Sequence, residues 1–548
     1  MIFCWIEVAL TVPVAFLAWK FLWQWYKQTP LRNIPGPPSP SFIIGNIVQL
    51  LHPLKSWKFH DEIVKQYGRI VRISGFLGDS MLYVSDPRVL HQVLLRDKQY
   101  FEESEVFLVS TSWLFGQGLL SSSGDVHRRH RKLLNPVFSG NSMRYLAPIF
   151  QRVTHELRDI LTTKVEKGRT ELDMMAWMTR LSLELIGQGG LGYSFDALNE
   201  RSTNRYGAAV KNLVPTLGKV AIFNQTIPWV DKIGPRAFRR FISHNMVSWW
   251  PSFNKLVGIV DVMDETTQEV FRHKKAALAK GDDALIHQIG EGRDIMSILL
   301  KASLSASEED RMSDIEMLGQ MNVLTFAAMD TTTSALSRIF LALAQHPDAQ
   351  EKLRAELLEA QMGGQDLTYD ELNNLPYLEA ITRETLRLYP PFPIITRTTT
   401  EDAVLPLAFP MVGADGSNMS ELHIAKNTEI IVSILAVNRD PGIWGPDAHE
   451  WKPERWLSPL PASLTDAGIP GVYSNTMTFF GGNRSCIGFK FALLEIKVVL
   501  SILLPHLRFS PTQSEIEWLM GTITSPCVKG RSGSMLPLDV ALVKDYSS

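Results

Sequence analysis

The sequence has few cysteines and no large surplus of either charge. Both features exclude classes of function. Only three cysteines occur among 548 residues, at positions 4, 486 and 527. Three cysteines cannot form a disulfide framework or a four-cysteine zinc site, and so few thiols are typical of a reducing compartment. Lys and Arg total 55 against 57 for Asp and Glu, a formal charge of −2. This balance predicts no nucleic-acid partner, since a general nucleic-acid binder carries a basic surplus.

The motifs of several common enzyme classes are also missing. The chain contains neither an HExxH zinc motif nor a phosphate-loop lysine motif. Residues 187–192 fit the spacing of a dinucleotide-binding turn, but residues 181–186 continue a helical pattern where that turn needs a strand. Position 207, where an acidic residue would bind a ribose, is glycine. We therefore predict that the glycines of residues 187–192 end a helix.

The amino terminus differs in composition from the rest of the chain. Residues 2–19 carry a single charge, Glu7, and would extend about 27 Å as a helix, close to the roughly 30 Å of a hydrocarbon core. Lys20, Lys27 and Arg32 lie on the carboxyl side of this segment, which predicts that the remaining chain faces the cytosol. We predict a transmembrane signal anchor over residues 1–30. A cleaved signal peptide, a buried helix and monotopic insertion are the alternatives.

A proline-rich segment and a long helical body follow the anchor. Residues 31–40 contain the run Pro-Gly-Pro-Pro-Ser-Pro and are predicted to form a semi-rigid hinge. No repeat or second linker follows, so residues 41–548 are predicted to form one body. Strands are predicted at residues 70–74 and 81–84 and again after residue 510, and helices at residues 127–134, 145–166, 173–186, 294–304 and 313–345. The predicted fold class is mainly α with small β-sheets.

The segment around Cys486 is the most informative part of the sequence. A lone cysteine is usually an inert buried residue. Here its neighbours are glycines, a cation and an aromatic ring: Gly482, Gly488, Arg484 and Phe479. A helical pattern resumes at residue 489, so the sulfur precedes a helix amino terminus, whose amides favour a thiolate. A thiolate held in this way can bind a metal, and a single cysteine suits the axial position of a heme iron.

This segment resembles the heme loop of the cytochrome P450 superfamily of heme-thiolate monooxygenases. Every fixed position of the family pattern Phe-x-x-Gly-x-Arg-x-Cys-x-Gly is met by residues 479–488. The resemblance implies the cytochrome P450 fold with heme b as the cofactor. It also implies that Cys486 is the axial metal ligand and that Arg484 and Phe479 contribute to heme binding.

Another family segment lies in a predicted helix that begins near residue 378. Glu384 and Arg387 are three residues apart, so they share one face of that helix. Arg455 follows in the Pro-Glu-Arg-Trp run of residues 453–456. The resemblance implies that these three side chains form a buried triad, which supports the core and takes no part in the chemistry.

The helix predicted over residues 313–345 carries a run of hydroxyl side chains at residues 331–334. Such residues are poor helix formers and can bond to backbone carbonyls. The resemblance implies that Ala327 and Ala328 leave room for dioxygen and that Thr331 and Asp330 deliver protons as the catalytic residues. Ala328 replaces the glycine of many family members, which narrows the expected oxygen groove.

A basic run covers residues 127–132. The resemblance implies that His127, in place of the commoner Trp, and Arg131 bind a heme carboxylate, and that Arg397 binds the other. The remaining cations are predicted to form a docking patch for an acidic electron donor: Arg128, Arg129, Lys132 and Lys490. The expected donor is an NADPH–cytochrome P450 reductase, with cytochrome b5 as a further candidate partner.

The substrate is expected to be lipophilic. By family position, residues 107–115 and 522–524 border the pocket together with a mostly apolar set: Phe115, Phe326, Ala327, Ile394 and Ile395. The chain resembles fungal microsomal members, many of which oxidise terpenoids or other secondary metabolites, so a terpenoid is favoured over a fatty acid or polyketide. The resemblance places the protein in the endoplasmic reticulum membrane as a single-pass protein facing the cytosol.

Two other functions stay open. One is a heme-thiolate isomerase or dehydratase that uses no dioxygen, although Asp330 and Thr331 argue for the monooxygenase. The other is a tethered heme-binding or sensing protein without turnover.

Overall fold

A computed structural model describes residues 30–202, 204–220, 226–235, 238, 240–241, 245, 250–280, 289 and 292–543. Residues 1–29 of the predicted anchor lie outside the described residues. Within these ranges, no helix is both long enough and apolar enough to cross a bilayer, which takes about 20 apolar residues. This finding corrects the predicted single-pass location in the endoplasmic reticulum membrane. The fold class is mainly α with small sheets, as the sequence predicted.

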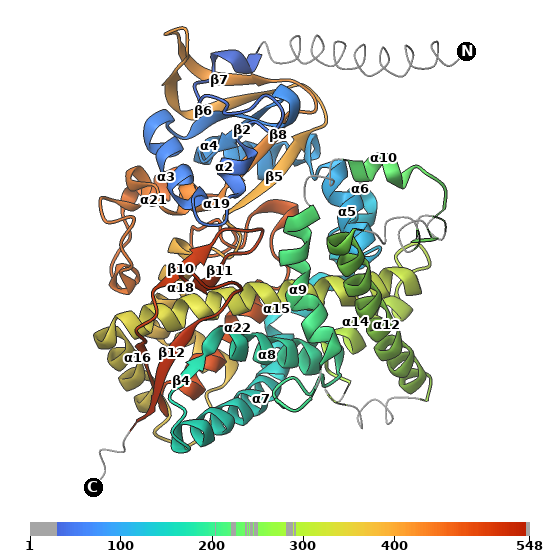
Figure 1. Cartoon of the computed structure of the whole chain (residues 1–548), viewed down its shortest axis with the longest axis vertical. Helices are drawn as coiled ribbons and strands as arrows, with labels where there is room; N and C mark the ends of the chain where they lie inside the picture. The colour runs from blue at the N-terminus through green and yellow to red at the C-terminus, as the bar shows by residue number, and fades with distance from the viewer. Residues whose placement is uncertain are drawn as a thin grey trace. The chain divides into compact units, whose positions relative to one another are not determined.

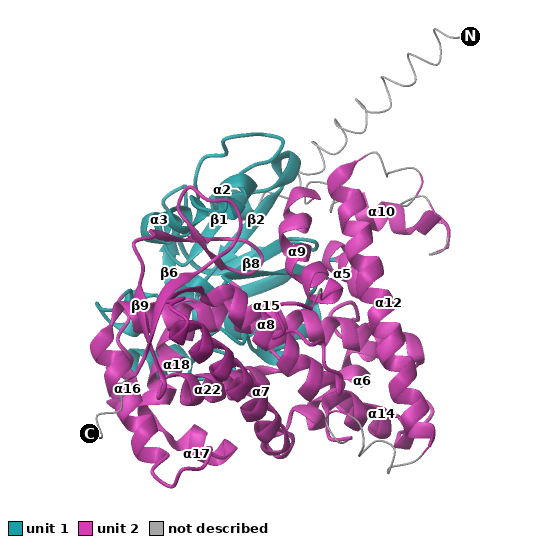
Figure 2. Ribbon diagram, turned by 60° about the horizontal axis from the view of Figure 1, so that its bottom comes forward, with its two compact units in different colours: residues 1–104, 393–449, 461–485 teal, residues 105–392, 450–460, 486–548 magenta. Residues whose placement is uncertain are grey.

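The chain divides into two compact units, which Figure 2 colours separately. Unit 1 combines residues 1–104, 393–449 and 461–485, and unit 2 combines residues 105–392, 450–460 and 486–548. Each unit is therefore built from segments far apart in the sequence.

Most of the described helices, including the longest, lie in unit 2 (Figure 1). They are α5 (Glu105–Phe115), α6 (Gly124–Leu134), α7 (Gly140–Glu166), α8 (Met174–Leu185), α9 (Arg205–Val220), α10 (Ile227–Asp231), α12 (Pro251–Ala279), α14 (Ile295–Ser305), α15 (Asp314–Gln345), α16 (Pro347–Ala360), α17 (Tyr369–Asn374), α18 (Pro376–Leu388) and α22 (Phe489–Leu503). Its strands form a three-stranded sheet in the order β4-β12-β9 and a β10-β11 hairpin. Their bounds are β4 (Glu171–Asp173), β9 (Leu507–Pro511), β10 (Ile516–Leu519), β11 (Ser525–Val528) and β12 (Pro537–Leu542).

Helix α15 is the longest helix described in unit 2, and its ends follow local rules. Ser313 caps its first turn and forms a capping box with Glu316. The helix ends before His346, because Pro347 cannot continue it. These bounds confirm the helix predicted over residues 313–345. Helix α15 packs against α8 and α22, so side chains on several of its faces are buried.

The glycine-rich residues 187–192 end a helix, as predicted. They form a π-helical turn, Ile186–Leu191, that extends α8. Gly192 follows in the left-handed conformation with φ 62°, which a residue with a side chain rarely adopts. A Cβ atom there would lie 2.6 Å from the Asp294 carboxylate.

Unit 1 is built on a mixed five-stranded sheet in the order β1-β2-β8-β5-β3. Its strands are β1 (Ile70–Ser74), β2 (Ser80–Val84), β3 (Phe101–Glu102), β5 (Ile394–Thr399) and β8 (Glu429–Ser433), and a separate hairpin pairs β6 (Ala403–Val412) with β7 (Asn418–Ile424). Its helices are α2 (Ile47–Leu51), α3 (Ser56–Tyr67), α4 (Pro87–His91), α19 (Ile434–Asn438), α20 (Pro441–Trp444) and α21 (Ala462–Ala467). Strands β2 and β8 pair in parallel and the other pairs are antiparallel.

The predicted hinge, residues 31–40, begins in contact with this sheet. Leu31 and Ile34 are buried, and the Arg72 amide of β1 donates a hydrogen bond to the Pro35 carbonyl at 3.0 Å. A Cβ atom on Gly36 would lie 2.0 Å from the Arg72 carbonyl oxygen, so only glycine allows this approach. The first half of the segment is thus packed on unit 1.

Candidate functional site

Cys486 lies three residues before Phe489, the first residue of α22, and is the predicted metal ligand. Its side chain is exposed, although the protein atoms around it desolvate the thiol. This desolvation raises the pKa of the Cys486 thiol to about 11, while a hydrogen bond from the Gly488 amide and the charge of Arg131 act to lower it. The helix amino terminus therefore does not by itself make a thiolate. A metal cation that displaces the proton would hold the sulfur in that form.

The two glycines beside Cys486, Gly482 and Gly488, have different roles in the structure. Gly482 is in the left-handed region with φ 73°, and a Cβ atom there would lie 2.1 Å from the Leu94 carbonyl oxygen within unit 1. A Cβ atom on Gly488 would meet only the Phe138 ring, at an ordinary 3.8 Å. Gly482 is thus required by backbone packing, whereas Gly488 acts at the sulfur through its amide.

Helix α6 of unit 2 presents two residues predicted to bind the cofactor. His127 is buried and Arg131 is half-buried, and their spacing of four places both on one face. Arg131 is close enough to Cys486 for its charge to lower the pKa of the thiol. The structure therefore brings this predicted cation and the predicted metal ligand into one region of unit 2.

Two further predicted cations lie in unit 1, where each has an acidic partner. Arg397 Nη1 on β5 is 2.9 Å from Glu103, and Arg484 Nη2 donates to Glu102 at 3.2 Å. The Phe480 ring lies 4.8 Å from the Arg397 guanidinium carbon. Arg484 Nε is buried and has no hydrogen-bond partner among the described residues. This donor could be satisfied by a carboxylate, which is the group that a heme offers at its edge.

Each unit, taken by itself, offers chemistry that fits a heme. In unit 2 a soft sulfur on an exposed side chain accepts an amide hydrogen bond. In unit 1 a buried guanidinium nitrogen lacks an acceptor among the described residues. Phe479 of unit 1, the predicted aromatic neighbour, is half-buried with its ring centroid 5.6 Å from that of Tyr473.

The predicted docking cations of α6 are paired with acids. Arg128 bonds to Asp125 at 2.7 Å, Lys132 bonds to Asp310 at 2.6 Å, and Arg129 pairs with Glu316. Each pair reduces the positive potential that would attract an acidic donor. Lys490 on α22 is half-buried, with its amine 5.8 Å from the Phe489 ring centroid.

Helix α15 places the predicted catalytic pair side by side. Thr331 Oγ1 donates a hydrogen bond to the Ala327 carbonyl at 2.6 Å, as expected for a hydroxyl inside a helix. Burial raises the pKa of Asp330 to about 7, and the charge of Lys211 on α9 opposes that rise. Asp330 can therefore hold or release a proton near neutral pH, which is the property that a proton relay requires.

The predicted pocket residues fall in both units. Phe115 of α5 and Phe326 of α15 are buried with ring centroids 4.8 Å apart in unit 2, and Ala327 beside them is half-buried. Ile394 and Ile395 lie half-buried on β5 of unit 1, where they pair with Ser433 and Val432 of β8.

The predicted triad residues meet in the core of unit 2. Arg387 donates to both carboxylate oxygens of Glu384, and Arg455 Nε lies 3.4 Å from Glu384 Oε1. The Trp456 indole and the Lys452 amide also donate to this carboxylate, each at 3.0 Å.

Sequence reasoning missed several partners of these residues. Glu102 and Glu103 pair with Arg484 and Arg397 across more than 290 positions, which no local pattern reveals. Lys211 likewise acts on Asp330 from another helix. The adjacent acids at residues 102–103 are the only local sign of these partners. By themselves they are typical of an exposed run of charges.

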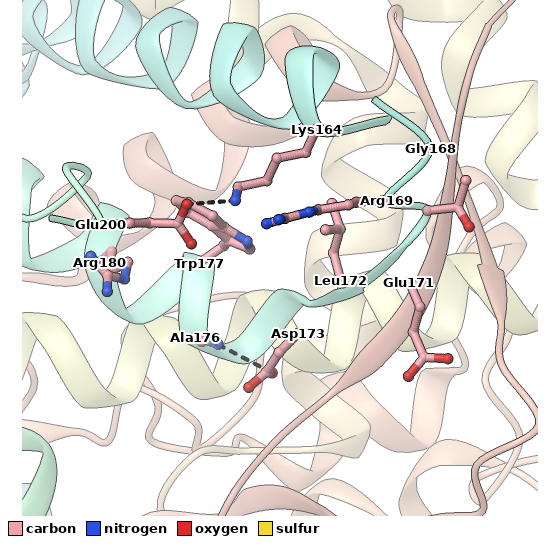
Figure 3. Close-up of a pocket in the computed structure, with 11 residues that line it drawn as sticks. Lys164, Gly168, Arg169, Glu171, Leu172, Asp173, Ala176, Trp177, Arg180 and Glu200 are labelled. Atoms are coloured by element: carbon pink, nitrogen blue, oxygen red, sulfur yellow. Dashed lines mark hydrogen bonds and ion pairs between the residues drawn. The ribbon is translucent and has the colours of Figure 1, made fainter. Parts of the chain in front are cut away.

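Two pockets lie at residues that the sequence did not select. One, of about 550 Å³ in unit 2, lies beside Trp177, with Lys164 directed toward Glu200 at 2.5 Å (Figure 3). The other, of about 670 Å³ in unit 1, is lined by His60, Arg69 and Phe409 among others. Neither pocket includes a predicted site residue.

The chain is similar to known proteins over most of its length. The family model Cytochrome P450 matches residues 35–526. Cytochrome P450 monooxygenase 212 of Postia placenta is 45% identical over 544 residues, which cover 99% of each chain. Ganoderic acid synthetase of Ganoderma lucidum is 42% identical over 516 residues, which cover 93% of this chain and 94% of that protein. The similarity thus extends over almost the full length of each relative.

Proposed function

This chain belongs to the cytochrome P450 family, and from that premise we propose that it oxidises a lipophilic terpenoid in fungal secondary metabolism. Family membership makes the protein a monooxygenase with a heme iron and a cysteine axial ligand. Members of the family draw electrons from a redox partner, and we propose an NADPH-dependent reductase for this role. The observation that carries the proposal is the exposed Cys486 side chain, whose sulfur accepts the Gly488 amide hydrogen bond.

We assign the cofactor-holding residues by their chemistry. Cys486 would bind the iron, and the cations Arg131, Arg397 and Arg484, together with His127, would bind the carboxylates. A thiolate-bound heme supplies dioxygen activation, because the sulfur donates electron density that favours O–O cleavage. The side chains supply orientation, protons and exclusion of water.

Asp330 and Thr331 would control proton supply. The Asp330 carboxyl, with a pKa near 7, can carry a proton at neutral pH, and Thr331 holds its hydroxyl proton toward the Ala327 carbonyl. Proton delivery at the wrong moment would release reduced oxygen as peroxide in place of product. The pair argues against an isomerase or dehydratase, which would have no use for delivered protons in oxygen activation.

The substrate assignment rests on pocket chemistry and on one relative. The Phe115 and Phe326 rings, tilted against each other with centroids 4.8 Å apart, and the small Ala327 form an apolar cluster without a charge for an ionic substrate. The ganoderic acid synthetase similarity supports a terpenoid. A fatty acid or polyketide is the alternative that the same surface could accept.

The metal ligand can be tested by spectroscopy with a matched cysteine. In the reduced carbon monoxide complex, Cys486→Ser should lose the red-shifted Soret band of a thiolate ligand. Cys527→Ser should keep it, because that buried thiol lies on β11. A red-shifted band in Cys486→Ser would overturn the ligand assignment.

The reaction can be tested in cells that express the protein with a reductase. Cells fed terpene scaffolds should yield a product heavier by one oxygen atom, detected by mass spectrometry. Thr331→Ala should form less product per NADPH and release more peroxide, whereas Thr333→Ala should not, since that hydroxyl has no partner among the described residues. A product without added oxygen would favour the isomerase instead.

A further inference from the structure

We propose that Ser334 and Arg338 of α15 hold the turn at residues 520–524 from its two ends and act as positioning residues for the substrate. The turn joins β10 to β11, whose pairing ends at Leu519 and Ser525. The functional part of this inference rests on the proposed monooxygenase function, and the structural part does not.

The first attachment is a buried hydroxyl pair. Ser334 Oγ lies 3.1 Å from Thr524 Oγ1, and the two residues are 2% and 1% exposed. The Thr524 amide also donates to the Pro391 carbonyl at 3.0 Å. Thr524 is thus bound to α15 through its side chain and to the segment after α18 through its backbone. A buried hydroxyl that loses its partner costs free energy, so this contact favours one position of the turn.

The second attachment is one helical turn further along α15. The Arg338 guanidinium carbon lies 3.3 Å from the Trp518 ring centroid and 4.2 Å from the Tyr389 ring centroid. A guanidinium between two aromatic faces is held by cation–π attraction and by stacking, which lysine cannot reproduce. Trp518 lies in β10, just before the turn, so α15 holds both ends of the segment.

These attachments fix the turn relative to the catalytic pair. Ser334 is three residues after Thr331, which places them on neighbouring positions of one helix face, about 4.5 Å apart along the axis. Because the turn has only a few residues between its attachments, Ile523 has little freedom to move. A substrate that packs against the turn would therefore meet the proton-delivering residues in a defined orientation.

Helix α15 provides a matched control for the serine. Ser337 is fully buried, and its hydroxyl has no hydrogen-bond partner among the described residues. Ser337→Ala therefore removes the same atom from the same helix without breaking a described contact. It should leave the turn unchanged if Ser334 acts through Thr524.

The test measures amide hydrogen exchange of residues 520–526 by mass spectrometry, on the full heme-loaded chain. Ser334→Ala and Thr524→Val should each exchange about fivefold faster, the double variant no faster than either, and Ser337→Ala like wild type. Arg338→Lys should also speed exchange of this segment. Equal exchange in Ser334→Ala and wild type, or equal acceleration in Ser337→Ala, would overturn the attachment.

The positioning role needs a second readout on one terpene scaffold that the wild type oxidises. Ser334→Ala should change the ratio of regioisomers and raise peroxide release, while Ser337→Ala keeps the wild-type ratio. An unchanged ratio would overturn the positioning role and leave the proposed function intact. If the wild type oxidised no scaffold, the proposed function would fail while the exchange experiment still decided the attachment.

Discussion

Arg387 donates hydrogen bonds from two nitrogens to the two carboxylate oxygens of Glu384, at 2.9 and 2.8 Å, and neither side chain reaches solvent. Arg455, the Trp456 indole and the Lys452 amide also donate to the carboxylate. Such a pair stabilises only when both charges remain, because a lone buried charge is costly.

Removal of Arg387 should therefore destabilise unit 2. Arg387→Ala should lower the free energy of unfolding by about 3–5 kcal/mol, measured by urea denaturation, because Glu384 would stay buried without its main partner. Arg144→Ala is the control, since Arg144 and Asp370 pair on the exposed surface and the variant should unfold like wild type. Similar destabilisation by both variants would contradict a special role for the buried triad.

Variants of the Arg397–Glu103 pair can test whether Arg397 has a structural role or binds the cofactor. Arg397→Ala should lose stability, because it leaves Glu103 in a buried site where desolvation raises the pKa of its carboxyl. Adding Glu103→Gln removes that charge and should restore much of the stability. Heme content per protein, measured by absorbance, should stay low in the double variant if Arg397 binds a heme carboxylate. A double variant with full heme content would limit Arg397 to a structural role.

Asp330 should give product formation a dependence on pH. Its pKa near 7 means that the carboxyl loses its proton as pH rises through neutrality, so product per NADPH should fall across that range. Asp330→Asn should show a lower and flatter profile. Lys211→Met should shift the midpoint to higher pH, because the Lys211 charge acts to lower the pKa of Asp330. If the pH profile of Lys211→Met had the same midpoint as that of the wild type, Asp330 would be excluded as the titrating group.

The sequence predicted what local chemistry determines and missed what the tertiary fold determines. Helix α15 began and ended as predicted, because Ser313 and Pro347 act within one turn of its ends. Glu384 and Arg387 could be paired because helical spacing alone places them together. The partner of Arg397 could not be predicted, because Glu103 approaches it only through the pairing of β3 with β5. The partner of Arg484 could not be predicted either, because Glu102 is 382 positions away in the sequence. The amide hydrogen bond at Cys486 was predictable from the helix start at residue 489, but the desolvation that raises the pKa of the thiol depends on the tertiary fold.

Glu495 gives the fold itself a dependence on pH. This carboxyl on α22 is fully buried, accepts a hydrogen bond from Ser182 at 2.5 Å, and has its second oxygen without a partner among the described residues. Desolvation raises the pKa of Glu495 to about 8, well above that of an exposed glutamate. The folded chain then binds a proton that the unfolded chain releases, so this group makes folding less favourable as pH rises from about 4.5 towards 8.

Glu495→Gln should remove that dependence and keep the Ser182 hydrogen bond. The variant should unfold like wild type at or below about pH 4, where the wild-type carboxyl is largely protonated in both the folded and the unfolded chain. Above that pH it should become the more stable protein, by up to about 1.4 kcal/mol for each pH unit, in urea denaturation followed at several pH values. Ser182→Ala serves as the control: it removes a donor that lowers the pKa, so it should enlarge the pH dependence where Glu495→Gln abolishes it. Parallel pH profiles for wild type and Glu495→Gln would show that Glu495 is ionised in the folded chain.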